Sequence, residues 1–177
     1  MTIANQMANQ RTVMVRSCAP LEAGPSALVN ISVRGLDGDD GLMLGELLYA
    51  AYKGTIDDEG QSLEEAHDEA IETLQGRYGH IIWPASFIAT GAADAADATD
   101  AEIAVSCCVV TDSEKFGPLI AFVATRPEFQ KRGLARTLIA KSIDALRDVD
   151  VDLVTLVVTN GNEPAISLYR KLGFSDS

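Results

Sequence analysis

Between Pro118 and Ile139 the chain reads Pro-Leu-Ile-Ala-Phe-Val-Ala-Thr-Arg-Pro-Glu-Phe-Gln-Lys-Arg-Gly-Leu-Ala-Arg-Thr-Leu-Ile. Its apolar run from Leu119 to Ala124 is short enough for a buried strand. Pro127 marks the end of that strand, because proline cannot donate to a strand ladder. After Gly133 the apolar side chains recur every three or four positions, which predicts an α-helix. The stretch therefore predicts a strand, a tight turn and a helix, in that order.

The turn in this stretch has the chemistry of an anion site. Lys131 and Arg132 directly precede Gly133 at the mouth of the expected helix. The first turn of a helix leaves about four amide N–H groups without partners and carries partial positive charge. A glycine lets a ligand approach the backbone closely. These features indicate a phosphate site, and the alternative is a strand–helix turn of the same composition that binds nothing.

Composition limits what the protein does. The chain has 177 residues, is 47% hydrophobic and carries a formal net charge of −12, which suits one domain with a sizeable core. The acidic balance argues against a nucleic-acid partner, which needs a basic face, and it weakly favours cationic small molecules or peptides. The sequence contains no apolar run of about 18 residues, so it predicts no membrane-spanning helix. The polar first ten residues lack a signal core, which predicts a cytoplasmic protein.

The three cysteines, Cys18, Cys107 and Cys108, form no disulfide framework and show no metal-ligand spacing. Cys107 and Cys108 are adjacent in an expected strand, so their side chains should point to opposite faces of a sheet. Buried or half-buried free thiols are therefore expected, and no metal is expected.

The other elements alternate between strands and helices. Strands are expected at Ala27–Val33, Tyr78–Trp83, Ser86–Ala89, Ile103–Val110 and Asp152–Thr159. Helices are expected at Leu42–Tyr52, from the Ser62–Glu65 capping box to just before Gly76, and at Glu163–Leu172. The low-complexity segment Gly91–Asp100 is interpreted as a loop. This order predicts a mixed α/β sandwich built on one sheet.

Two motifs give the chain a resemblance. Gln130-Lys-Arg-Gly-Leu-Ala135 resembles a Q/R-x-x-G-x-G/A signature, and Asn162-Glu-Pro-Ala-Ile-Ser-Leu-Tyr-Arg-Lys-Leu-Gly-Phe174 resembles N-x-x-A-x-x-L-Y-x-x-x-G-F. Both are signatures of the GCN5-related N-acetyltransferase (GNAT) family, which the chain resembles from about Ala27 onward. The resemblance implies a mixed, mostly antiparallel sheet flanked by helices. Residues 1–26 are then an N-terminal extension with at most one added strand, and residues 27–177 the acetyltransferase domain.

The resemblance implies acetyl-CoA as co-substrate and direct transfer, in a ternary complex, to a primary amine of a small molecule or peptide. Backbone groups that would contact the pantetheine arm belong to Val123, Ala124 and Thr125. Amides that would hold the pyrophosphate belong to Lys131, Arg132, Gly133, Leu134, Ala135 and Arg136. Asn162 binds the pantetheine or positions the last helix, and Tyr169 protonates the leaving thiolate unless it is only a core aromatic. The alternative is a non-catalytic acyl-CoA-binding module with the same fold.

The acceptor side is less defined. Asp57, Asp58 and Glu59 form either an acidic lip for a cationic acceptor or a solvated loop, and Trp83 is a further candidate for the acceptor pocket. Some family members carry a glutamate on the strand before the glycine motif, but Leu119 to Ala124 contains no acid. The general base is therefore a water chain or an acid from Asp57 to Glu59.

The chain departs from the family pattern after Gly173-Phe174, where members commonly add two strands and this chain has three more residues. The edge of the strand expected at Asp152–Thr159 then has three possible fates. The fold lacks the two strands, the N-terminal extension covers the edge, or another chain covers it, as in a homodimer. An uncovered edge favours association. We expect Thr12–Arg16 to join the sheet there.

Overall fold

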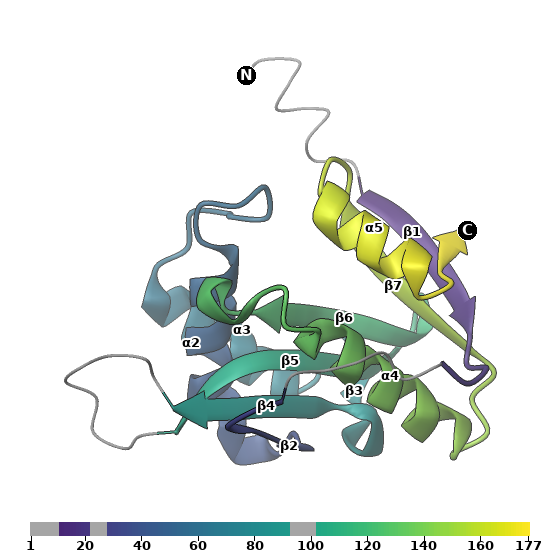
Figure 1. Ribbon diagram of the computed structural model, residues 1–177, viewed down its shortest axis with the longest axis horizontal. Coiled ribbons are helices and arrows are strands. Elements are labelled where there is room, and N and C mark those ends of the chain that lie inside the picture. Colours follow the sequence, from purple (N-terminus) through teal and green to yellow (C-terminus); the bar gives the residue numbers. More distant parts are fainter. Residues whose placement is uncertain (1–10, 22–27, 93–101) are drawn as a thin grey trace.

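The computed structural model describes residues 11–21, 28–92 and 102–177. It contains one eight-stranded sheet with helices on both faces (Figure 1). The strands pair in the order β2-β4-β5-β6-β7-β1-β8, with β3 attached to β5. All pairings are antiparallel except that of β6 with β7. The predicted mixed α/β sandwich on one sheet is confirmed.

The strands are β1 (Arg11–Ser17), β2 (Ile31–Gly35), β3 (His80–Ile81), β4 (Phe87–Ala92), β5 (Glu102–Ser113), β6 (Gly117–Thr125), β7 (Leu153–Thr159) and β8 (Ser175–Asp176). The α-helices are α2 (Gly41–Tyr52), α3 (Leu63–Leu74), α4 (Leu134–Arg147) and α5 (Glu163–Lys171). Short 3-10 turns occupy η1 (Gly38–Asp40), η2 (Trp83–Ala85) and η3 (Pro127–Phe129).

Three expected boundaries need correction. The strand expected at Ala27–Val33 begins only at Ile31, and Ala27 lies outside the described residues. The strand expected at Tyr78–Trp83 is reduced to β3, because a 3-10 turn with proline in its first positions begins at Trp83. Gly91 and Ala92, expected in a loop, still pair with β5, and the rest of that loop from 93 to 100 lies outside the described residues.

The expected strand at Thr12–Arg16 is confirmed as β1. It runs antiparallel to β7, from Arg11 opposite Thr159 to Ser17 opposite Leu153, and the two strands lie side by side in Figure 1. On its other edge, β1 pairs with the two-residue β8. The side chain of Met14 is fully buried, which anchors the strand to the core. The N-terminal strand therefore covers the edge of β7.

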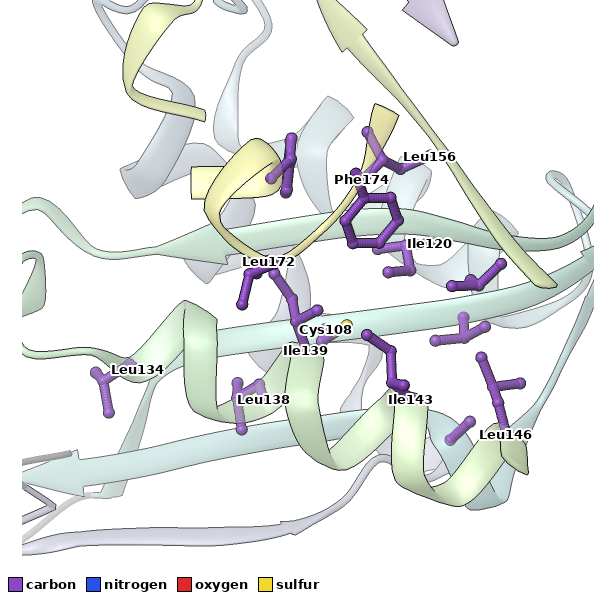
Figure 2. Packing of buried hydrophobic residues seen from close by; sticks show 14 of the residues in the cluster. Cys108, Ile120, Leu134, Leu138, Ile139, Ile143, Leu146, Leu156, Leu172 and Phe174 are labelled. Atoms are coloured by element: carbon purple, nitrogen blue, oxygen red, sulfur yellow. The ribbon is translucent and has the colours of Figure 1, made fainter. Parts of the chain in front are cut away.

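The core has two parts, one on each face of the sheet. Figure 2 shows the larger part, where α4 directs Leu138, Ile139 and Ile143 onto the sheet and where Leu172 and Phe174 join the same cluster. The buried face of α4 repeats every three or four residues, as Ile139, Ile143 and Leu146 show, and it is the apolar face that the sequence predicts. On the opposite face α2 packs against β5 and β6, and α3 packs against α2.

The cysteines lie as expected. All three are free and buried, and Cys107 and Cys108 point into opposite parts of the core. Burial raises the pKa of both Cys107 and Cys108 to about 12, so these thiols stay protonated and unreactive at neutral pH.

We expect iodoacetamide at pH 8 to leave Cys107 and Cys108 unmodified in the native protein, because both side chains are inaccessible and protonated. In guanidinium chloride all three cysteines should react. Intact-mass and peptide mass spectrometry measure both states. Fast labelling of Cys107 or Cys108 under native conditions would contradict this burial.

The sheet opens between β6 and β7. These parallel strands pair only at Leu119 with Thr155 and at Ile120 with Leu156. Beyond those pairs they diverge toward their carboxyl ends, as Figure 1 shows. Residues 122–125 of β6 therefore keep β5 as a neighbour on one side and have no ladder partner in β7. Such a gap at the carboxyl ends of parallel strands is a frequent place for a ligand site.

Candidate active site

A cavity of about 770 Å³ lies at this opening. Its walls come from the end of α2 and the loop after it, the last residues of β6, the turn before α4, and α5. Nine of the ten predicted cofactor-binding residues line the cavity, all except Arg132: Val123, Ala124, Thr125, Lys131, Gly133, Leu134, Ala135, Arg136 and Asn162. Thus the fold brings the two sequence motifs to one cavity.

The backbone of β6 presents polar groups to this cavity. The Arg126 N–H donates to the Val105 carbonyl at 2.9 Å, so this residue pair is hydrogen-bonded. Bonded and non-bonded pairs alternate along an antiparallel ladder, and the register places Val123 and Thr125 in non-bonded pairs with β5. Their N–H and C=O groups therefore point away from β5, toward the opening. Consistently, the Gln130 side chain donates to the Thr125 carbonyl at 3.3 Å.

The turn before α4 forms a concave array of amides. Lys131 has φ 62° and Gly133 has φ 82°, so two residues of this short turn are left-handed. Gly133 leads directly into Leu134, the first right-handed residue of α4, and such a step from a left-handed to a right-handed residue turns successive N–H groups inward, which favours an anion-binding nest. Holding a non-glycine residue such as Lys131 in that region costs on the order of 1 kcal/mol, and such strain is concentrated at functional sites. Gly133 is also the N-cap of α4, whose dipole adds positive potential there.

The Arg132 side chain lies elsewhere. Its guanidinium stacks over the Phe129 ring at 4.8 Å from the centroid, and it donates to the Glu128 carbonyl at 3.0 Å. The side chain is thus folded back over the turn. Lys131 and Arg136, and also Lys171 of α5, bring positive charge to the cavity instead.

Tyr169 projects from α5 into the same cavity. Its side chain is 9% exposed, and its ring meets that of Phe174 edge-on at 5.9 Å between centroids. Burial raises the pKa of Tyr169 well above the ordinary tyrosine value, with further increases from Cys108 and Asp57. The phenol is therefore protonated at neutral pH and can donate a proton.

Asn162 uses both ends of its amide. Its Oδ1 accepts from the Ala165 N–H at 3.2 Å, which caps α5. Its Nδ2 donates to Oδ2 of Asp57 at 2.8 Å, across 105 sequence positions. One side chain therefore fixes both the start of α5 and the loop that follows α2.

Only one of the predicted acceptor residues faces the cavity. Asp57 lines it, whereas the Asp58 carboxylate accepts from the backbone N–H groups of Gly54 at 2.7 Å and Gly60 at 2.8 Å. Glu59 forms an ion pair with Arg11 at 3.2 Å. Trp83 is 40% exposed on η2 and does not line the cavity.

Sequence reasoning missed Tyr52. This residue ends α2, lines the cavity, and has a pKa raised well above the ordinary value by burial, with smaller increases from Cys107, Tyr169 and Asp57. The helix is apolar nearly all round, so no periodic pattern singles out one position. Tyr52 is identifiable only when the loop after α2 is seen against α5.

Neither a metal site nor a membrane span is found in the described part of the chain. Within residues 11–21, 28–92 and 102–177, no three His, Cys, Asp or Glu side chains are grouped so that they could hold a metal ion. None of the helices in those ranges has the length and apolarity needed to cross a membrane.

Comparison with known proteins identifies the family of this chain. Residues 55–174 match the model of the acetyltransferase (GNAT) family. The chain is 30% identical, over 164 residues, to a mycothiol acetyltransferase of Tsukamurella paurometabola, a match that covers 91% of this chain and 54% of that protein. It is 35% identical, over 82 residues, to a [ribosomal protein bS18]-alanine N-acetyltransferase of Salmonella typhimurium, covering 46% of this chain and 52% of that protein.

The fold is shared with solved structures. A GCN5-related N-acetyltransferase from Sphaerobacter thermophilus superimposes with a TM-score of 0.67 at 19% identity, covering 94% of this chain and 48% of that one. This likeness confirms the predicted GNAT-type sheet. In these matches the chain spans at most about half the length of the relatives.

Proposed function

Because this chain belongs to the acetyltransferase (GNAT) family, we propose that it transfers an acetyl group from acetyl-CoA to a primary amine of a small molecule or peptide. One observation carries the proposal: the amide nest at Lys131 and Gly133 and the protonated Tyr169 line a single cavity. The nest suits a pyrophosphate, and the phenol suits a leaving thiolate.

In the proposed complex the pyrophosphate lies on the nest, where Lys131 and Arg136 add positive charge. The pantetheine arm runs along β6 and uses the backbone groups of Val123 and Thr125 that face away from β5. The Val123 N–H then donates to the thioester carbonyl oxygen and stabilises the oxyanion, as strand amides do in acyl transfer. Residues 27–177 supply these groups, and the extension 1–26 contributes β1.

The chemistry needs one proton donor on the sulfur side. The uncharged amine nitrogen forms a bond to the thioester carbon. As the tetrahedral intermediate collapses, the carbon–sulfur bond breaks and the nitrogen loses a proton to solvent. The thiolate then takes the Tyr169 proton, which solvent replaces. Placed acids and bases contribute typically about 10²–10⁴-fold, and alignment of the two substrates adds to this.

The acceptor is assigned as a cationic amine. The net charge of −12 attracts cations over long distances, and Asp57 places a carboxylate in the cavity. The relatives named above differ in acceptor, since one name specifies mycothiol and the other an alanine of a ribosomal protein. Both a small molecule and a peptide terminus are therefore kept in the proposal.

Acetyl-CoA is expected to stabilise the protein by mass action. A ligand at one hundred times its Kd adds about 2.7 kcal/mol, which raises the Tm of a chain this long by about 5–10 °C. Thermal denaturation with 1 mM acetyl-CoA measures this, and thiol release with a panel of amines measures turnover.

The variant Ala135→Glu is the matched control for this test. It puts a carboxylate in the first turn of α4, which favours the helix but competes for the nest, so the acetyl-CoA shift should vanish. A wild-type shift without thiol release from any amine would indicate the non-catalytic alternative. Absence of the wild-type shift would overturn acetyl-CoA binding itself.

A further inference from the structure

We infer that Asp57 accepts the proton of the acceptor ammonium, and that Asn162 is the positioning residue that aims its carboxylate. The inference rests on the proposed function and assigns the base that this function leaves open. Asp57 would be a catalytic residue because it touches the reacting amine, whereas Asn162 acts through Asp57.

Location is the first argument. Among the described residues that line the cavity, Asp57 is the only carboxylate. Its two neighbours in sequence have other partners: Asp58 holds its own loop through the Gly54 and Gly60 amides, and Glu59 pairs with Arg11. The three consecutive acids are therefore not interchangeable, and only the first can meet a substrate.

Orientation is the second argument. The Asn162 Nδ2 donates to Oδ2 of Asp57 at 2.8 Å, and a carboxylate with one oxygen bonded this way keeps Oδ1 as an acceptor for a substrate N–H. Because Asn162 is itself held by the Ala165 N–H, the carboxylate is fixed through the end of a helix. A charge held in advance needs no reorganisation when the amine reacts.

Placement on one helix is the third argument. Asn162 is the N-cap of α5, Tyr169 lies within that helix, and both line the cavity. Asn162, which holds the proposed base, and Tyr169, the proposed acid, therefore face the same cavity. The charge of Asp57 also helps to raise the pKa of Tyr169, which indicates that both groups lie within electrostatic reach.

The loop that carries Asp57 is tied down near the cavity. Glu59 reaches Arg11 of β1, and the β1 hydroxyl of Thr12 donates to Asn160 at 2.6 Å. Ile56 packs on the turn before α5, with its Cδ1 only 3.1 Å from the position of a Cβ on Gly161. These contacts hold the loop on the turn that ends in Asn162.

The charges around Asp57 suit an ammonium. The other titratable groups that line the cavity are Tyr52 from α2, Tyr169 and Lys171 from α5, and Lys131 and Arg136 from the turn before α4 and its first residues. Both tyrosines are neutral because burial raises their pKa values. The cations of the α4 turn lie where phosphates are proposed, so Asp57 is the one negative group among the described residues that an ammonium can meet in the cavity.

The proton balance is complete without a further reactant. An ammonium N–H proton passes to Asp57 Oδ1, and the freed electron pair forms the bond to the thioester carbon. The carbon–sulfur electrons go to sulfur, which takes the Tyr169 proton. The second amine proton restores Tyr169 through solvent, and Asp57 releases its proton. The sum converts an ammonium and acetyl-CoA into an amide, coenzyme A and one proton.

The test compares pH–rate profiles of kcat/KM for an amine that the wild type acetylates. Asp57→Asn can still accept the Asn162 hydrogen bond, so the loop is kept while the base is lost. We expect kcat/KM at pH 7 to fall about 10²-fold. The remaining activity should climb about tenfold per pH unit until the free amine dominates, because a free amine needs no base. Asp68→Asn, an exposed acid on α3, is the control and should match the wild type.

The positioning role has its own variant. Asn162→Asp keeps an oxygen for the Ala165 N–H, so α5 stays capped. It removes the donor to Asp57 and places a second negative charge beside it, which disfavours the ionised carboxylate. The acidic limb of the profile should therefore move to higher pH in this variant. Asn162→Ser caps α5 without adding a charge, so it tests the lost donor alone. It should move the limb in the same direction but less, whereas the limb would stay in place in Asn162→Ser if Asn162 only caps the helix.

The outcomes separate this inference from the proposed function. If Asp57→Asn raises the KM of the amine but keeps the wild-type kcat and acidic limb, Asp57 only anchors the substrate and the base assignment is wrong. If Asn162→Ser leaves the limb unmoved, the positioning role is wrong. In both cases the wild type still acetylates amines. If the wild type binds acetyl-CoA but releases no thiol with any amine, the proposed function fails, and the inference fails with it.

Discussion

Tyr169→Phe should lower kcat about 10²–10⁴-fold and leave the affinity for acetyl-CoA nearly unchanged. The substitution removes the phenolic proton but keeps the ring, which packs edge-on against Phe174, so the cavity retains its shape. A lost general acid costs about this factor. Steady-state thiol release gives kcat, and calorimetric titration gives the affinity.

The pH dependence of the wild type sharpens this prediction. Burial raises the pKa of Tyr169 above its ordinary value, so the acid form persists across neutral pH. Activity should fall on the basic side only above about pH 10, the ordinary tyrosine value. Tyr78→Phe is the control, because Tyr78 is a half-buried tyrosine that donates to Glu69 at 2.7 Å outside the cavity. Equal losses in the two variants would refute a specific role for Tyr169.

Gly79→Ala should destabilise the fold by about 4 kcal/mol or more, which is in the range reserved for severe backbone or packing faults. Gly79 has φ 109° and precedes β3. A Cβ there would lie 2.2 Å from the Asp112 carbonyl oxygen. That oxygen belongs to the backbone of β5, which pairs with both β3 and β6 at Asp112, so it cannot move away cheaply. Urea denaturation measures the loss.

Gly117→Ala is the matched comparison for Gly79→Ala. Gly117 is also left-handed, with φ 64°, but a Cβ there meets nothing within 4 Å. Its cost should be only that of the backbone conformation, about 1 kcal/mol. The difference between the two variants then isolates the steric contact with β5. Similar stabilities for both would mean that β3 and β5 can separate at this point without loss.

Much of the fold is readable from local patterns. The helix after Gly133 and the capping box of Ser62 and Glu65 are both present, because each depends on residues within a few positions. The strand at Thr12–Arg16 is also readable, since it carries an apolar residue such as Met14 at the buried register. The strand Tyr78–Trp83 is wrong in length, because Pro84 supports a 3-10 turn that strand propensity does not reveal.

In the candidate site, too, residues within local motifs are predictable from the sequence, and residues defined by contacts between distant segments are not. The nest and Tyr169 lie inside motifs whose spacing is visible in sequence. The distinction of Asp57 from Asp58 and Glu59 is not visible there, because it depends on a hydrogen bond to Asn162 at 105 positions' distance. Tyr52 is missed for the same reason. Residues that act through contacts between distant segments need the fold before they can be singled out.

The pairing of β1 with β7 also governs the order in which the sheet can be completed. The side chains of Thr12 and Asn160, which hydrogen-bond across these strands, are 148 positions apart. At about 5–20 residues per second, a ribosome makes β7 on the order of ten seconds after β1. During that time Met14 has no core to enter. Pairings over such distances also slow folding, because the loop must close before its contacts are gained. The strand β1 is thus synthesised well before its partner β7 and can pair with it only late.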